Sequence, residues 1–495
     1  MGVVLTNCRV YGLDEADTVA VDKGRVYYVG RWTRFDRRFT VERVIDLQGA
    51  TVLPGLVDSH MHLQSTALTR MGLDLRGLRS IEELKELVEA KARSLGEGRW
   101  IIGRGWDQEL FREGRLPDRM DLDEVAPKNP VLLYRVCGHV AVANTLALRK
   151  AGLLETNKDG ILREEEVGVV AKHIPKLKVE ELAEAIYETM IEASRLGLTS
   201  LHCMSVSKSE FEALRVLKSR IGNLPLRLFI YFKPNLVDYM EEARKSEDEY
   251  LKIKGLKLLT DGSLGGWTAA LTEPYIDNPS SRGVLLLSKD RLAYYMRMAE
   301  SKGFQLAVHA IGDRAINLVL ETASKLKFDR SLLRIEHVSL TPPETLKLLR
   351  EYRPMVTVQP RFTVTDWWVD RRLGPRARYV YMFKTLIAMG LKVAGGSDSP
   401  VEPLNPWLGL EAAVTRDLLA KHGLSEALAP DEALRIYTTG GDEVSLEMHH
   451  GPCEGLRADL IAVDRFDPGT LGSVNVLMTM VDGRIVYIDP SLGKA

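Results

Sequence analysis

Alternating hydrophobic and polar residues mark both ends of the chain as rich in β-structure. The segment VAVDKGRVYYVG, residues 19–30, contains two alternating runs joined by Lys23-Gly24. The segment VNVLMTMVDGRIVYIDP, residues 474–490, repeats this pattern around Asp482-Gly483. Because such residue pairs tolerate the positive φ that a tight turn requires, each segment predicts a β-hairpin.

Between the two ends, apolar strand-like segments alternate with amphipathic helical segments. Residues 179–196 and 289–303 have apolar positions at three- and four-residue spacing, which predicts helices. The strand-like segments are residues 53–62, 197–204, 224–232, 253–262, 304–313, 332–340, 354–360 and 392–400. Eight parallel strands separated by helices are typical of a closed barrel. The predicted fold class is therefore α/β, with a TIM-like (β/α)8 barrel.

A long segment interrupts this alternation after the first strand. Residues 63–179 separate the first strand from the helix that precedes the second strand. An insertion at the catalytic end of a barrel forms either a lid or pocket wall, or a structural appendage. We favour the lid or pocket wall.

The composition is typical of a globular protein without a nucleic-acid or membrane partner. Hydrophobic residues make up 45% of the chain and charged residues 27%. The 67 Lys and Arg nearly balance the 68 Asp and Glu, so no net basic charge attracts phosphates or anionic lipid. No apolar run approaches the roughly 18 residues of a membrane span, and the four cysteines show no CxxC spacing. We expect a cytoplasmic protein with reduced thiols.

Several histidines and one aspartate fall where the predicted strands end. His60 and His62 lie two residues apart, so on a strand both side chains point to the same face. His309, His337 and Asp398 lie near the ends of the fifth, sixth and eighth strands. A single histidine at such a place is more often a hydrogen-bonded core residue. The whole set, however, offers the nitrogen and oxygen ligands that zinc accepts, so it predicts a metal centre at the barrel mouth.

These residues, with Lys257 on the fourth strand, resemble the amidohydrolase superfamily. The motifs GHVAVANTLAL, KLLTDGSLGGWTAAL, VHAIGDRA, IEHVSL and GGSDSPVEPLNPW are similar to its amidohydrolase-3 branch, which includes N-substituted formamide deformylase. The resemblance spans nearly the whole chain. It implies a small β-sandwich of residues 1–53 and 440–495, beside a barrel of residues 54–439. It also implies one or two bound divalent metals, expected to be zinc.

The resemblance further implies that Lys257 carries a carbamate, N6-carboxylysine, and bridges two metals. Carboxylation requires a neutral amine, which a desolvated site near cations favours by lowering the pKa of the lysine. The alternative is that Lys257 forms an ion pair with an acid such as Asp261.

Four residues are candidates for contact with a substrate. The resemblance singles out Trp106, Asp107 and His139, and Asp261 opens the glycine-rich loop after the fourth strand. His139 has the alternative role of a buried histidine that positions its loop, and Asp261 that of a turn cap. His202, which ends the second strand, is expected to pack or to line the pocket rather than to bind metal.

Taken together, these features predict a hydrolase that cleaves the C–N bond of an amide, a formamide or an N-acyl amine. In the expected reaction a metal-bound hydroxide attacks the carbonyl carbon of a small-molecule substrate. Asp398 is the predicted catalytic residue that carries the proton to the leaving nitrogen. The alternatives are a deaminase, a hydrolase of cyclic amides or imides, and a non-catalytic interaction protein on the same fold. A homodimer is the assembly that we consider.

Overall fold

The structure of the chain is a computed structural model. The structure describes residues 2–36, 39–136, 138, 140–163, 165–175, 177–416, 426–467 and 471–492. It contains two compact units. One consists of Met1–Leu63 with Tyr187–Ala495, and the other of Gln64–Ile186.

The first unit is built around a parallel sheet of eight strands. Their order is β19-β18-β17-β16-β15-β14-β13-β7, and every pair is parallel. The predicted strand segments correspond to β7 (Leu56–Met61), β13 (Leu198–Val206), β14 (Arg227–Phe232), β15 (Leu251–Leu259), β16 (Gln305–Ala310), β17 (Leu333–His337), β18 (Met355–Val358) and β19 (Val393–Gly395).

The two outer strands of this sheet approach each other, so that the sheet is nearly closed as a barrel. The backbone N–H of Asp398 donates to the carbonyl of His60 at 2.6 Å, and that of His62 donates to the carbonyl of Ser399 at 2.8 Å. These bonds join the segment after β19 to the end of β7. The α/β barrel expected from the sequence is thereby confirmed.

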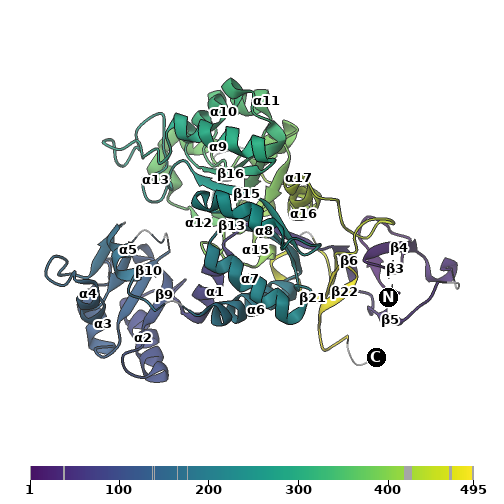
Figure 1. Cartoon of the computed structure of the whole chain (residues 1–495), viewed down its shortest axis with the longest axis horizontal. Helices are drawn as coiled ribbons and strands as arrows, with labels where there is room; N and C mark the ends of the chain where they lie inside the picture. The colour runs from purple at the N-terminus through teal and green to yellow at the C-terminus, as the bar shows by residue number, and fades with distance from the viewer. Residues whose placement is uncertain are drawn as a thin grey trace. The chain divides into compact units, whose positions relative to one another are not determined.

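Helices follow the barrel strands, and α9, α10 and α11 lie outside β15 and β16 (Figure 1). The predicted helices at residues 179–196 and 289–303 form as α6 (Val179–Arg195) and α9 (Lys289–Lys302). The others are α7 (Lys208–Ile221), α8 (Met240–Arg244), α10 (Asp313–Leu326), α11 (Pro343–Tyr352), α12 (Phe362–Thr365), α13 (Val369–Leu373), α14 (Phe383–Ala388), α15 (Pro406–Thr415), α16 (Pro430–Ile436) and α17 (Thr439–Ser445).

Two further sheets are formed by the ends of the chain. One has the order β4-β3-β1-β5 and the other β2-β6-β20-β21-β22. Their strands are β1 (Val3–Thr6), β2 (Arg9–Val10), β3 (Thr18–Asp22), β4 (Arg25–Gly30), β5 (Arg43–Asp46), β6 (Thr51–Pro54), β20 (Leu460–Val463), β21 (Val476–Val481) and β22 (Arg484–Ile488). One apolar cluster contains Leu5 and Val19 from the first sheet and Leu460 and Met478 from the second. The sheets therefore share a core, as in a sandwich.

Both predicted hairpins are present in these sheets. Strands β3 and β4 are joined by Lys23 and Gly24, which have φ values of 48° and 76°. Strands β21 and β22 are joined by Asp482 and Gly483, with φ values of 53° and 72°. The left-handed backbone at both positions is typical of the tight turn that the sequence indicated.

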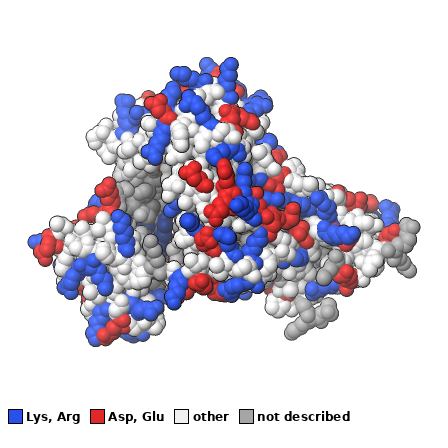
Figure 2. All heavy atoms as spheres, viewed as in Figure 1, with Lys and Arg blue, Asp and Glu red and all other residues white. Residues whose placement is uncertain are grey.

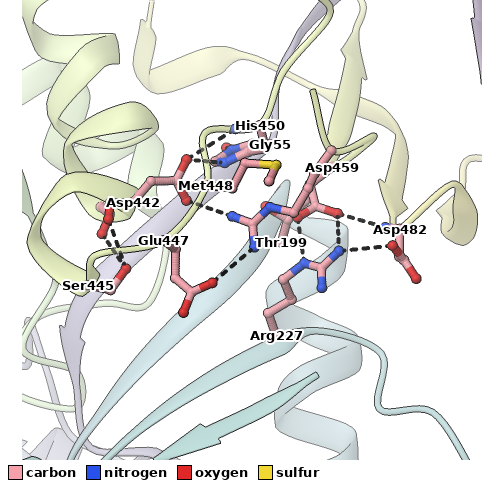
Figure 3. A network of polar contacts seen from close by, with 12 residues as sticks. Gly55, Thr199, Arg227, Asp442, Ser445, Glu447, Met448, His450, Asp459 and Asp482 are labelled. Carbon is pink, nitrogen blue, oxygen red and sulfur yellow. Dashed lines mark hydrogen bonds and ion pairs between the residues drawn. The ribbon is translucent and has the colours of Figure 1, made fainter. Parts of the chain in front are cut away.

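A buried network of charges joins the terminal strands to the end of the barrel opposite the strand carboxyl ends (Figure 3). At the start of β14, Arg227 Nε lies 2.7 Å from Oδ2 of Asp459, which precedes β20. His450 lies between a carboxylate and a carbonyl: Nδ1 is 2.7 Å from Asp442 Oδ2, and Nε2 is 2.7 Å from the oxygen of Gly55. Because both neighbours are acceptors, both ring nitrogens carry protons, and Asp442 raises the pKa of His450 against the effect of burial.

Helix α17 belongs to the barrel side of this junction. Its residue Val444 packs against Met355 of β18 and Ala394 of β19. After the barrel, the strands of the terminal sheets begin with β20.

The second unit, Gln64–Ile186, contains the segment after the first strand. It has a sheet of order β12-β11-β10-β9-β8, with β8 (Leu73–Asp74), β9 (Ile101–Trp106), β10 (Val131–Arg135), β11 (Val140–Ala143) and β12 (Ile161–Arg163). Its helices are α1 (Leu63–Met71), α2 (Ile81–Leu95), α3 (Arg119–Val125), α4 (Thr145–Ala151) and α5 (Glu165–Ala171). Two apolar clusters form its core, one with α2 and α3 and one with α4 and α5. A segment with its own sheet and core is a small domain rather than a loop.

Basic and acidic side chains are interspersed on the face of the described residues that Figure 2 shows. This distribution agrees with the near balance of charges in the sequence. Among the described helices, none has both the length and the apolar character needed to cross a bilayer.

Candidate metal centre

The barrel strands bring all six predicted metal ligands to one end of the sheet. The register places Lys257 beside Ala307, Leu259 beside His309, and Ala310 beside His337. The carboxyl ends of β15, β16 and β17 therefore lie at the same level. The six residues are His60 in β7, His62 just after it, Lys257 in β15, His309 in β16, His337 in β17 and Asp398 after β19.

His60, His62 and Asp398 form the tightest part of the cluster. Their candidate ligand atoms all lie within 4.8 Å of one another. Oδ1 of Asp398 is 3.2 Å from Nε2 of His62 and 3.4 Å from Nε2 of His60. Lys257 joins this group, because its Nζ lies 3.3 Å from Nε2 of His60.

The remaining two histidines continue the cluster across the barrel mouth. The ring centroid of His337 lies 4.9 Å from that of His60 and 4.5 Å from that of His309. The structure therefore assembles every residue that the sequence placed in the ligand set.

Two of these residues have an unusual backbone conformation. His337 has a φ of 76° and Asp398 a φ of 57°, both in the left-handed region. A non-glycine residue in such a conformation costs about 1 to 3 kcal/mol and persists where the surrounding structure holds it. The hydrogen bond from Asp398 N to His60 O is one such restraint. The strain falls at the end of β17 and in the segment after β19, where each chain segment carries a candidate ligand.

Hydrogen bonds at the far side of each ring determine which nitrogen faces the cluster. Nδ1 of His62 lies 3.0 Å from a backbone carbonyl of β13, and Nδ1 of His337 lies 2.7 Å from Oε1 of Gln359. Because these oxygens accept, Nδ1 carries a proton in both rings, and Nε2 is the nitrogen that faces the cluster. His309 has the opposite arrangement. Its Nε2 lies 3.0 Å from a backbone carbonyl after β15 and carries the proton, so Nδ1 has the lone pair that could bind a metal.

The electrostatics of the site favour neutral histidines beside an ionised carboxylate. Burial lowers the pKa of His60 and His309 well below the usual value, and lowers that of His337 to about 3. Burial alone would raise the pKa of Asp398, but His60 and its neighbouring histidines hold that pKa well below the usual range. Neutral imidazoles and an ionised carboxylate are the forms in which these groups bind metals.

Lys257 is buried, with 2% of its surface exposed. Burial lowers the pKa of its amine to about 8, although Glu336 and Asp398 act in the opposite direction. A minority of the amine is therefore neutral near neutral pH, more than for an ordinary lysine. The alternative ion pair with Asp261 is not among the contacts of the described residues.

Asp261 instead receives hydrogen bonds from three backbone amides. Its Oδ2 accepts from Ala270 N at 2.9 Å and Gly312 N at 2.8 Å, and its Oδ1 accepts from Ile311 N at 3.1 Å. Burial nevertheless raises the pKa of Asp261 to about 7. These bonds favour the turn-cap alternative, since Asp261 holds the loop after β15 against the start of α10.

The other substrate-contact candidates belong to the second unit. The Trp106 side chain is fully buried in that unit's core, where its Nε1 donates to Leu133 O at 2.9 Å, and this placement supports a structural role. Asp107 forms an ion pair with Arg135 at 2.7 Å and is 17% exposed. His139 lies outside the described residues. Contact of these three with a substrate stays a prediction.

Several buried polar residues around the site were not predicted. Glu336 and Arg334 lie on β17, Gln359 follows β18, and Asp58 lies on β7, where it binds the Ser397 N–H at 2.9 Å and the Ser397 hydroxyl at 2.5 Å. A signal for the first two was present. In LLRIEH two opposite charges alternate within an otherwise apolar strand, a pattern that places a buried ion pair inside the barrel.

His202 packs, as the sequence suggested. It is fully buried, and its Nδ1 lies 2.8 Å from Nη1 of Arg334. Its ring meets Phe229 edge-on with the centroids 4.9 Å apart. It is therefore a neighbour of the Arg334 network rather than part of the ligand cluster.

The donor set fits a divalent metal ion. Four imidazoles, an ionised carboxylate and a buried amine lie at one mouth, and the candidate ligand atoms of His60, His62 and Asp398 are within 4.8 Å of one another. Mixed nitrogen and oxygen ligands suit zinc and neighbouring transition metals.

Comparison with known proteins gives the same result at the level of the family. The sequence model of the amidohydrolase family matches residues 43–487. The chain belongs to this family. The putative amidohydrolase YtcJ of Bacillus subtilis is 31% identical to it, over 96% of this chain and 96% of the relative.

Further relatives agree with this membership. N-substituted formamide deformylase of Arthrobacter pascens is 26% identical, over 95% of each chain. The crystal structure of an uncharacterized metal-dependent hydrolase from Pyrococcus furiosus superposes with a TM-score of 0.80 at 36% identity, covering 94% of this chain and 100% of that one. The protein is therefore a metal-dependent hydrolase of the amidohydrolase family.

Proposed function

We propose that this protein hydrolyses a C–N bond in a small molecule, namely an amide, a formamide or an N-acyl amine. The observation that carries the proposal is the assembly of four histidines, Lys257 and Asp398 at one barrel mouth. The similarity to N-substituted formamide deformylase supports a formamide or a related amide as the substrate class.

His60, His62, His309, His337 and Asp398 would hold one or two divalent metal ions, with zinc the proposed metal. A metal ion in such a site lowers the pKa of bound water and polarises a carbonyl group. The chain's own residues must supply the orientation of the ligands and the movement of the proton.

Lys257 would extend the ligand set as a carbamate. Its neutral amine would form an N–C bond with carbon dioxide and release one proton to solvent, leaving two carboxyl oxygens as donors. The location of Nζ, 3.3 Å from His60 Nε2, supports this role because the added oxygens would project into the same cluster. A pKa of about 8 supports it as well, because the reaction requires the neutral amine.

Asp398 would act as the proton carrier. As water adds to the carbonyl carbon and the C–O bond forms, the carboxylate accepts one proton of that water. The C–N bond then breaks while Asp398 returns the proton to the nitrogen, because an amine leaves poorly unless it is protonated. The group is ionised, as a proton acceptor must be.

The experiment is a substrate panel with zinc-loaded protein and with protein stripped by a chelator. The panel contains N-formyl amines, N-acyl amines, cyclic amides and imides, and an aminopyrimidine as a deaminase substrate. We expect zinc-dependent release of an amine from the first two classes. Turnover confined to the cyclic or aminopyrimidine compounds would contradict the proposed bond type, and no turnover by a zinc-replete protein on any member would contradict the hydrolase proposal.

A further inference from the structure

A fully buried ion pair lies directly behind one of the candidate metal ligands. Glu336 and Arg334 both have fully buried side chains, and Nε of Arg334 lies 2.7 Å from Oε1 of Glu336. The other carboxylate oxygen, Oε2, is 2.5 Å from Nδ1 of His60, whose side chain is also fully buried. The three residues form a chain of charge-assisted contacts from the barrel interior to the metal cluster.

Arg334 is itself held in place from several sides. Its Nε donates to the hydroxyl of Thr357 at 2.8 Å, and its Nη1 lies 2.8 Å from Nδ1 of His202. Its guanidinium also lies over the ring of Tyr231, 5.2 Å from the centroid. These contacts therefore fix the position of the guanidinium beside Glu336.

Such a pair is a poor source of stability. Two charges lose their hydration on burial, and apolar residues of similar volume often give an equal or higher stability in the same place. The contact of Glu336 with His60 gives the pair a different role, because it determines which nitrogen of His60 carries the proton. Because Oε2 of Glu336 accepts, Nδ1 carries the proton and Nε2 points its lone pair toward Lys257 and Asp398, at 3.3 and 3.4 Å.

His60 differs in this respect from the other histidines of the cluster. Its far-side nitrogen lies 2.5 Å from a carboxylate oxygen. The far-side nitrogens of His62 and His337 face neutral oxygens, and that of His309 lies 3.0 Å from a backbone carbonyl and 3.4 Å from Oδ1 of Asp261. A carboxylate partner makes an imidazole a stronger donor than a neutral oxygen does, because it stabilises positive charge on the ring.

We infer that Glu336 is a positioning residue that fixes the tautomer and ring orientation of His60 and strengthens its Nε2 as a metal ligand. Arg334 holds Glu336 in place and compensates its charge. The inference rests on the proposed function in that it takes this cluster to be a metal centre.

The first experiment compares zinc affinity in the parent and in Glu336→Gln, by competition with a chromophoric chelator. Glutamine keeps the shape but not the charge. Loss of such an outer contact typically weakens metal binding about 10- to 100-fold, and we expect a change of that size. The visible spectrum of the cobalt-loaded protein should also change, because it reports on the ligand field of the metal itself.

Gln305→Met provides the matched control. Gln305 is likewise buried in the barrel, where it accepts from Tyr231 at 2.7 Å and donates to Val444 O at 3.1 Å, without a described contact to the cluster. This variant should lose stability but keep the zinc affinity and cobalt spectrum of the parent. A purely structural role for Glu336 would give both variants the same result.

A second variant guards against misfolding of Glu336→Gln, which leaves Arg334 without an anionic partner. In Arg334→Met/Glu336→Met both charges are removed together, so no buried charge is left unpaired. The fall in zinc affinity should persist, because Nδ1 of His60 still lacks its carboxylate. Parental affinity and spectrum in a folded Glu336→Gln or in the double variant would overturn the inference. A parent that binds no zinc would instead refute the proposed function.

Discussion

The change Asp398→Asn separates two roles of one side chain. Oδ1 of Asp398 lies 3.2 Å from Nε2 of His62 and 3.4 Å from Nε2 of His60, so an oxygen of the carboxylate is aimed into the cluster. Asparagine retains the shape and one oxygen, and it can still lie against both rings. Its amide cannot accept a proton from water at neutral pH.

The expected loss follows from that difference. General acid–base catalysis typically contributes about 10² to 10⁴ in rate, which corresponds to about 3 to 5 kcal/mol of transition-state stabilisation. The variant should lose at least the lower figure in kcat. Metal content should fall less, since four histidines remain in the cluster, and the affinity for a substrate analogue should change little.

The assay measures kcat, metal content and analogue binding on the same preparations. Asp313→Asn is the matched control, because Asp313 is a buried aspartate that binds Thr272 N at 3.0 Å outside the ligand set. It should keep the parental rate. If Asp398→Asn keeps its metals and turns over within a few-fold of the parent, Asp398 is not the proton carrier.

Three further predictions concern the ligand lysine and the two units. Lys257→Ala should lose part of the bound metal and most of the activity, and acetate should restore some rate if its carboxylate replaces the proposed carbamate; unchanged metal by elemental analysis would contradict this. Asp459→Asn should lower the free energy of unfolding by about 3 kcal/mol, the low end for a broken buried ion pair. The low end applies because Asp482 Oδ1 still lies 3.2 Å from Nη2 of Arg227, and urea titration measures the change (Figure 3). Trp106→Ala should cost about 3 to 5 kcal/mol in the second unit, as is typical of a buried aromatic, while leaving metal content unchanged. Metal loss equal to that in Lys257→Ala would place Trp106 with the ligand set.

Much of the barrel could be predicted from the sequence, because local patterns there carry the information. Buried parallel strands appear as short apolar runs, and candidate ligands such as His60 and His309 occur where those runs end. The Asp482-Gly483 turn could also be predicted from the sequence, since few residue pairs adopt the positive φ values that it requires. These features depend on neighbours in the chain.

The features that were missed depend on residues distant in the chain. Glu336 lies 276 positions from His60, and its carboxylate acquires a role only when β7 and β17 share one barrel. The burial of Trp106 depends on how α2 and α3 cover the sheet of the second unit, and its contact with a substrate stays a prediction. For Asp261 the sequence allowed either a substrate contact or a turn cap. The three backbone amides that donate to it come from two separate segments of the chain. Pairings of this kind are fixed by tertiary packing.

Elemental analysis of the purified protein tests the central claim most directly. Protein prepared without chelator should contain about one to two equivalents of a divalent metal per chain, as in related mononuclear and two-metal sites. The variant His60→Asn/His62→Asn, prepared in parallel, should lose most of that metal while remaining folded by circular dichroism. Parent protein that contains no metal and takes up none from added zinc would contradict the assignment of this cluster as a metal centre.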